Sequence, residues 1–276
     1  MKKRLIIAAV VLLALAITVV LIRRAGNGRE EGVIAASGNV EVTEVNVAFK
    51  IPGRVLSLLT DEGRTVVKGD KLAVLDSAEY ASQVAQNRAN LRNTEAQLEK
   101  AKKDLERYET LYKKEAISAQ QLDSARTGHD VALAQSQQAA AAVRMSEVRM
   151  SDTMIYATTA GVVLRKNIEA GETVQAGVPI FTIGDLTDPW IKVYIKEDKL
   201  GMVKLGQKVR ITTDSYPGKA YEGTTSYISS EAEFTPKNVQ TQEERVKLVF
   251  GVKVSVKNEH FELKPGMPAD VKIYLK

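Results

Sequence analysis

Two segments of the chain, residues 52–76 and 160–184, repeat one pattern of apolar and glycine positions. At a constant offset of 108 residues they share seven identities, and these include the glycine pairs Gly53/Gly161, Gly63/Gly171 and Gly69/Gly177. Each copy is typical of two short apolar strands with glycines at turn positions of positive φ. Because a repeat this short cannot bury its apolar face alone, the two copies are predicted to pack on each other.

The chain is therefore expected to hold one small β-domain, residues 46–76 plus 155–185, that is split by a long insert. Two unrelated hairpins that share turn residues are the alternative, which accounts poorly for seven identities at one offset. The predicted core of the domain is formed by Val55, Leu56, Val66, Leu72, Val74, Val163, Leu164, Val174 and Ile180.

The insert, residues 77–152, is predicted to be an antiparallel helical hairpin. It has no proline and one glycine, Gly128, and strong helix formers dominate it. Heptad spacing marks one seam at Val84, Leu91, Leu98, Leu105 and Tyr112, widened by Ala101 and Tyr108. The returning seam is expected at Leu122, Ala125, Ala132, Leu133, Ala139 and Val143.

The turn of the hairpin can be placed from a capping box. Ser118 followed by Gln121 fits that motif, and Ile117 with Leu122 fits a hydrophobic staple. The first helix is therefore expected from about Ala78 to Lys114, and the second from about Ala119 to Ser151.

An apolar run of 18 residues, Leu5–Ile22, contains Thr18 as its one polar member. Its length matches the hydrocarbon core of a bilayer, and no good cleavage site follows it. We expect an uncleaved membrane anchor within residues 1–28, with cleavage as the alternative; Lys2, Lys3 and Arg4 would keep the N-terminus in the cytoplasm. The rest of the chain, beginning with a linker and first strand at 29–45, would then be exported.

Charge and composition exclude several classes of function. Residues 1–28 carry the whole net charge of +5, so no basic surface for nucleic acid is left. There is no cysteine, hence no disulfide or thiol chemistry. The two histidines, His129 and His260, lie far apart in sequence, so neither a metal site nor an enzyme is expected.

The last third, residues 186–276, is predicted to be a small β-barrel. Strands are expected at 190–195, 207–212, 247–252 and 270–274, and Pro217-Gly218 and Pro265-Gly266 fit type II turns. The polar segment 231–245 is expected to be a loop. Trp190, the one tryptophan, is expected to pack in the barrel.

These parts together resemble the periplasmic adaptors, or membrane fusion proteins, of the hemolysin-secretion type. The resemblance rests on Pro52-Gly53…Leu75-Asp76, on the loop Glu233–Thr241 and on Leu263–Asp270. It implies an elongated, mainly α+β chain with a split biotinyl/lipoyl-like sandwich, an inserted coiled-coil hairpin, a β-barrel and an N-terminal transmembrane helix. No biotin or lipoate is expected, because the hairpin replaces the tip that carries the modifiable lysine. A fourth, membrane-proximal domain is expected to be missing or vestigial, because the chain ends just after the last barrel strand.

The resemblance also implies a docking site at the hairpin tip. Family adaptors that dock TolC-like outer-membrane channels carry an Arg, a Leu four residues later and a Ser seven residues after that. This sequence has Arg107, Leu111 and Ser118 at those spacings, around a turn located independently. The implied partners are an inner-membrane transporter, most similar to the ABC type, a TolC-like channel and further copies of the chain in a hexameric ring.

The implied function is an adaptor for efflux or secretion, anchored in the inner membrane of a Gram-negative cell with its bulk in the periplasm. An anchored envelope protein without a role in transport is the first alternative. A biotinyl carrier is the second.

Overall fold

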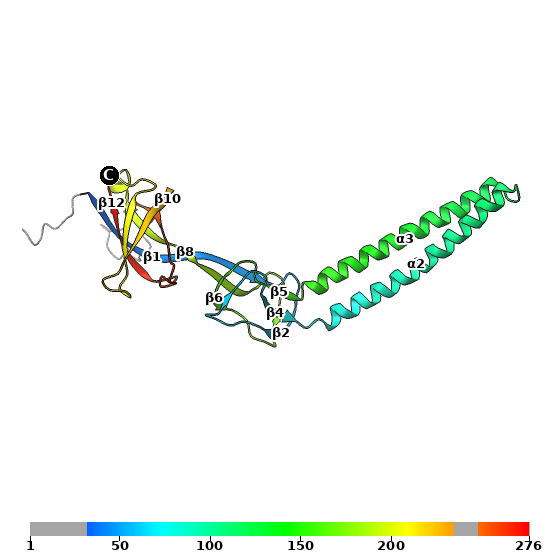
Figure 1. Ribbon diagram of the computed structural model, residues 1–276, viewed down its shortest axis with the longest axis horizontal. Coiled ribbons are helices and arrows are strands. Elements are labelled where there is room, and N and C mark those ends of the chain that lie inside the picture. Colours follow the sequence, from blue (N-terminus) through cyan, green and yellow to red (C-terminus); the bar gives the residue numbers. More distant parts are fainter. Residues whose placement is uncertain (1–31, 235–247, 276) are drawn as a thin grey trace, which may run out of the picture. The chain divides into compact units, whose positions relative to one another are not determined.

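The computed structural model describes residues 32–234 and 248–275, which divide into two units (Figure 1). One unit is formed by the described residues up to Thr43 and from Leu186 onward, and the other by Glu44–Asp185. The predicted anchor, Leu5–Ile22, lies outside the described residues. Among the residues that are described, no helix is both long and apolar enough to cross a membrane.

The central unit contains the split sandwich that the repeat predicts. The first copy supplies β2 (Gly53–Leu58), β3 (Thr65–Val66) and β4 (Lys71–Leu75). The second supplies β6 (Gly161–Lys166), β7 (Thr173–Val174) and the start of β8 (Pro179–Lys196), with β5 (Met154–Tyr156) before them. Each copy pairs with strands of the other, because β2 lies beside β7 and β3 beside β6.

The pairing of strands follows the same 108-residue offset as the sequence. Gly53 opposite Val174 has its counterpart in Gly161 opposite Val66, and Val55 opposite Leu75 has its counterpart in Val163 opposite Ile183. The two copies are therefore related by an approximate two-fold axis within one domain, and each sheet takes strands from both copies.

The core of the sandwich confirms most of the predicted set and corrects part of it. Val55, Val66, Leu72, Val163, Val174 and Ile180 are buried in one cluster with unpredicted neighbours such as Phe49, Leu75 and Ile183. Leu56, however, is 62% exposed, and Val74 and Leu164 are only half-buried. Leu56 directly follows buried Val55 in β2, and successive side chains of a strand point to opposite faces.

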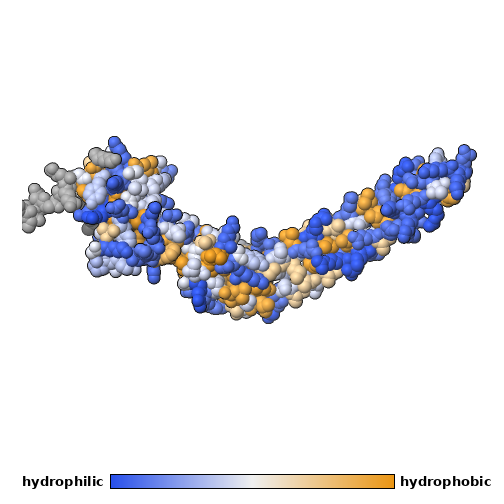
Figure 2. Space-filling view, viewed as in Figure 1, coloured by the Kyte–Doolittle hydropathy of each residue, from blue (hydrophilic) through white to orange (hydrophobic). Residues whose placement is uncertain are grey.

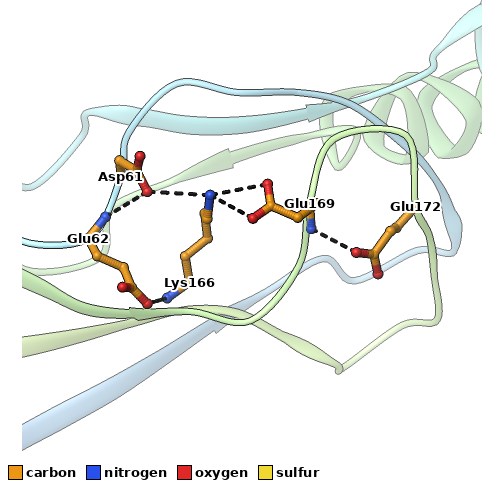
Figure 3. A network of polar contacts seen from close by, with 5 residues as sticks. All are labelled: Asp61, Glu62, Lys166, Glu169 and Glu172. Atoms are coloured by element: carbon orange, nitrogen blue, oxygen red, sulfur yellow. Dashed lines mark hydrogen bonds and ion pairs between the residues drawn. The ribbon is translucent and has the colours of Figure 1, made fainter.

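A polar network joins the two copies at the sandwich surface (Figure 3). The Lys166 ammonium lies 3.4 Å from the Asp61 carboxylate and 2.9 Å from that of Glu169. The Lys166 backbone N–H donates to Glu62 Oε1 at 2.9 Å. The pKa of Lys166 is raised, chiefly by its hydrogen bond to Glu169. The network therefore supports the contact of the two copies with charged hydrogen bonds at its rim.

The other unit is a closed barrel of β1 (Val33–Ala48), β12 (Pro268–Tyr274), β9 (Lys208–Thr212), β10 (Ala220–Phe234), β11 (Leu248–Val256) and β8, with β1 also paired to β8. A short helix, α4 (Glu197–Leu200), follows β8. Its core includes Ile34 and Val40 of β1 beside Ile191, Ile211 and Val254. Both expected type II turns are present, with φ of +84° at Gly218 and at Gly266.

Two expectations for the barrel need correction. Residues 33–39 lie in the segment expected as linker and first strand; they form that strand, and they pair with β12, so the barrel includes a strand from before residue 186. Residues 231–234, expected to begin a loop, belong to β10, and Ala232–Phe234 pair with β11; the rest of the expected loop, 235–245, lies outside the described residues. Trp190 is half-buried rather than a core residue, and its indole N–H donates to Glu41 Oε2 at 2.9 Å.

The insert is an antiparallel hairpin of α2 (Ala78–Lys113) and α3 (Ala119–Ser151), as predicted (Figure 1). Asn87 Nδ2 donates to the Ala142 carbonyl at 3.2 Å, and Arg88 pairs with Glu147 at 2.6 Å. The buried seam of α3 consists of Ala132, Ser136, Ala139, Val143 and Ser146, while Leu133 and Tyr112, both predicted in the seam, are exposed. Small residues in the α3 seam allow α2 to approach closely.

Candidate functional site: the hairpin tip

The tip of the hairpin is formed by the last turn of α2, a short loop and the first turn of α3. α2 ends in a pair of reversed hydrogen bonds, in which Glu115 N–H donates to Tyr112 O at 2.9 Å and Ala116 N–H donates to Leu111 O at 3.0 Å. This is a Schellman motif. Its left-handed position, usually glycine, is held by Glu115 with φ of +54°.

The capping box predicted from the sequence is present at the start of α3. Gln121 N–H donates to Ser118 Oγ at 3.3 Å, and Ser118 N–H donates to Gln121 Oε1 at 2.9 Å. Two backbone donors at the helix start are thereby satisfied. Ser118 is exposed, so its side chain both caps the helix and lies at the surface of the tip.

Arg107 and Leu111 lie four residues apart on α2, a spacing that places them on one face of the helix. The Arg107 side chain is 67% exposed, and its guanidinium is 3.4 Å from the Asp104 carboxylate. Leu111 is half-buried, and its backbone carbonyl accepts a hydrogen bond of the Schellman motif. The tip thus presents a cation, a partly exposed apolar side chain and a hydroxyl, on a turn whose backbone groups are hydrogen-bonded.

A groove of about 780 Å³ opens between the helices just below the tip. Its walls include Asp104, Tyr108, Gln121 and Gly128. A Cβ placed on Gly128 would meet nothing within 4 Å, so the missing side chain contributes directly to the opening. Asp104 belongs both to the groove and to the ion pair with Arg107, which places the groove beside the predicted docking residues.

The feet of the hairpin are tied to the sandwich by polar contacts. Asp76 accepts from the Ala78 N–H at 3.2 Å and from Arg54 at 2.9 Å. These two contacts lower the pKa of Asp76, the backbone contact most. The Tyr80 hydroxyl donates to the Pro52 carbonyl at 2.8 Å, and Lys50 lies 3.6 Å from Asp152. Both helices are therefore fixed where they enter the sandwich.

Among the described residues, no group of three or more His, Cys, Asp or Glu side chains could hold a metal ion. His129 is a half-buried residue of α3, 3.1 Å from Asp130, and His260 is an exposed turn residue. At the hairpin tip the predicted Ser118 cap is confirmed, and Arg107 and Leu111 lie on one face of α2. The left-handed Glu115 was not predicted, because a non-glycine residue in the left-handed region leaves no signal in the sequence.

Comparison with known proteins shows which families and solved structures share this architecture. Residues 56–165 match the YBHG alpha-helical hairpin domain family, and residues 190–273 match the YknX-like beta-barrel domain family. The crystal structure of MacA from Actinobacillus actinomycetemcomitans is similar at a TM-score of 0.76 and 25% identity, covering 89% of this chain and 79% of that one. A MacA-MexA chimeric protein that contains the Pseudomonas aeruginosa MexA α-hairpin domain is similar at a TM-score of 0.68 and 25% identity, covering 90% of this chain and 84% of the chimera.

The fold is also shared by the membrane fusion protein Spr0693 of Streptococcus pneumoniae R6, at a TM-score of 0.69 and 21% identity over 88% of this chain and 99% of that one. The fold and the hairpin are those of membrane fusion proteins, which confirms the resemblance. A UPF0194 membrane protein of Acidithiobacillus ferridurans is 30% identical over 326 aligned positions, covering 99% of this chain and 96% of the relative. The chain belongs to the UPF0194 membrane protein family.

Proposed function

We propose that this protein is the adaptor subunit of an efflux or secretion system, linking an inner-membrane transporter of the ABC type to a TolC-like outer-membrane channel. The hairpin tip carries the proposal, because Arg107 and Ser118 are exposed there beside Leu111 on a hydrogen-bonded turn. An exposed guanidinium donates to carbonyl or carboxylate groups on a partner, and an apolar neighbour adds contact area. The role is one of binding, without catalysis, cofactor or nucleic acid.

The rest of the proposed arrangement follows the family. Copies of the chain form a ring, hexameric by resemblance, and Leu5–Ile22 anchors each copy in the inner membrane with the N-terminus in the cytoplasm. The domains are assigned as anchor 1–28, linker and first strand 29–45, split lipoyl-like domain 46–76 plus 155–185, hairpin 77–152 and barrel 186–276. The barrel assignment is extended by β1.

A charge reversal at the tip tests the proposal. Arg107→Asp removes the donor and inverts the charge, and should abolish export and crosslinking of the channel to a cysteine placed at Leu111. The free energy of unfolding should change by no more than about 0.5 kcal/mol, because Arg107 is a surface residue with one exposed ion pair.

Arg144→Asp is the matched control, since Arg144 is an exposed arginine of α3 far from the tip. It should leave export and channel crosslinking intact. If both variants leave export intact, or both impair it equally, the tip has no docking role. The alternative, an anchored envelope protein without a role in transport, is then favoured. An intact mass free of any covalent increment would exclude the biotinyl-carrier alternative.

A further inference from the structure

One end of the barrel holds the chain where it leads toward the proposed membrane anchor, and we call it the anchor-side end. There the N–H of Leu275, just after β12, donates to the carbonyl of Gly32, just before β1, at 2.8 Å. Gly32 comes ten positions after the last residue of the apolar run Leu5–Ile22, and a chain of that length spans at most about 35 Å. With this run as the anchor, the anchor-side end therefore lies close to the membrane.

A loop at the same end, residues 201–206, presents two apolar side chains to solvent. Leu205 is 65% exposed and Met202 is 45% exposed, whereas Val203 is buried in the barrel core. The loop lies beside the end of β12, because Met202, Leu205 and Leu275 line one hollow of about 480 Å³. Two large apolar side chains are thus exposed at the end of the barrel from which the chain leads toward the anchor.

Hydrogen bonds to the barrel brace the backbone of this loop. The buried Gln207 side chain donates through Nε2 to the Met202 carbonyl at 3.0 Å and accepts at Oε1 from the Lys204 N–H at 2.9 Å. The Gly206 N–H donates to the Thr225 carbonyl at 2.8 Å. A backbone group that has a partner within the protein loses little when water is removed around it. The braced loop can therefore enter an apolar environment without leaving these groups unpaired.

Lysines flank the two apolar side chains. Residues 199–208 contain no acid and three exposed lysines, Lys199, Lys204 and Lys208. The nearest acids before this run, Glu197 and Asp198, lie in the first turn of α4. Segments that combine apolar side chains with lysines bind at the boundary between lipid headgroups and acyl chains, and anionic headgroups attract the lysines.

Exposure alone does not single out this end of the barrel. On the face drawn in Figure 2, apolar and hydrophilic residues lie side by side over the barrel surface, as is usual for proteins. The anchor-side end is distinguished by three properties together, which are its short connection to the apolar run, its braced backbone and its uninterrupted lysines.

We infer that the loop 201–206 inserts Met202 and Leu205 into the headgroup region of the membrane that carries the anchor, while the flanking lysines contact the phosphates of anionic lipids. The lipid surface is favoured over a protein partner, because every chain is held within reach of it by its own anchor. The inference rests on the anchor of the proposed function and adds a second membrane contact to each chain, which would fix the orientation of the barrel at the membrane.

A fluorescent probe at position 205 tests the inference in the full chain, which has no cysteine of its own. Leu205→Cys is labelled with an environment-sensitive dye, and the chain is reconstituted without a transporter into vesicles of equal parts phosphatidylcholine and phosphatidylglycerol. Lipids that carry a spin label on the acyl chain should quench the dye, and iodide on both sides of the membrane should not.

Ser215→Cys is the matched control, because Ser215 is exposed in the connection from β9 to β10 at the opposite end of the barrel. Its dye should be quenched by iodide and not by the spin-labelled lipid. A dye at position 205 that behaves like the control would overturn the inference. Protection from iodide that appears only after a transporter is added would overturn it as well, because the loop would then bind a protein.

Lys204→Glu gives a second measurement, because it reverses a charge beside the probe at position 205. The ratio of inserted to free loop, read from the dye emission, should fall about fivefold or more. Lys264→Glu is the control, since Lys264 is exposed at the opposite end, where the Gly266 N–H donates to the Val40 carbonyl. It should leave the ratio unchanged, and equal effects of the two variants would contradict a contact with lipid phosphates.

The membrane contact and the adaptor role can fail separately. A chain that stays in the vesicles in alkaline carbonate but shows no lipid quenching at position 205 would remove the loop contact alone. Lipid quenching together with no crosslinking of the hairpin tip to the channel would remove the adaptor role alone. Release of the chain by carbonate would remove the anchor and, with it, the inference.

Discussion

Replacing Glu115 by glycine should slow the opening of the hairpin tip. Glu115 has φ of +54°, a conformation that costs a side-chain-bearing residue about 1–2 kcal/mol. Glycine removes that cost but adds roughly 0.5–1 kcal/mol of backbone entropy to the unfolded state. The net stabilisation is therefore about 0.5–1 kcal/mol, or a two- to fivefold change in the opening equilibrium.

Native-state hydrogen exchange of the Ala116 amide measures this opening, because that N–H donates to Leu111 O within the Schellman motif. Exchange should slow two- to fivefold in Glu115→Gly. Lys114→Gly is the neighbouring control. Lys114 has φ of −93°, so glycine there relieves no backbone strain and only adds entropy to the unfolded state. Exchange of the Ala116 amide should therefore accelerate by a similar factor. Faster exchange in Glu115→Gly, or equal effects of the two glycines, would refute the left-handed cap.

Three further outcomes are expected. Leu72→Ala should cost about 2–5 kcal/mol in urea unfolding, because Leu72 is fully buried, while Leu56→Ala should stay within about 0.5 kcal/mol. The pKa of Glu262 is lowered, chiefly by its hydrogen bond to the Lys219 ammonium at 2.6 Å. The ionised Glu262 carboxylate therefore stabilises the fold at pH values above the ordinary pKa of 4.5, and this stabilisation is lost as the pH falls through the lowered pKa. Glu262→Gln should therefore be less stable than the wild type at neutral pH and equal to it in strong acid, and a constant difference would contradict the ion pair. Gly128→Ala should raise the thermal midpoint through about 0.5–1 kcal/mol of helix propensity, since nothing lies within 4 Å of the added methyl; a lower midpoint would mean that the groove at Gly128 is filled.

The sequence predicted features that are local, or that repeat at a constant offset. The limits of both helices and the Ser118 cap were found because a capping box is complete within four residues. The split sandwich was predicted because its two copies share identical residues at one constant offset in the sequence. The burial of Leu56 was predicted wrongly, because two adjacent apolar residues in a strand do not reveal which one faces inward.

Pairings between distant segments that share no repeat were not predicted. Residues 33–39 belong to the barrel because they pair with residues 268–274. No local sequence pattern predicts a strand partner that far away in the chain. The α3 seam was placed partly on Leu133, whereas Ala132 and Ser136 are buried. A close approach of helices selects small side chains over the more hydrophobic leucine.

The position of the hairpin's feet has a consequence for how such chains vary. β4 and β5 are adjacent, with Val74 paired to Met154, so the insert leaves and re-enters the sandwich one strand spacing apart, about 5 Å. One heptad added to each helix would lengthen the arm by roughly 10 Å without moving either foot. The length of the hairpin can therefore vary while the strands that hold its two ends stay the same. Such a change in length would match the hairpin to the distance it has to span without altering the β-core.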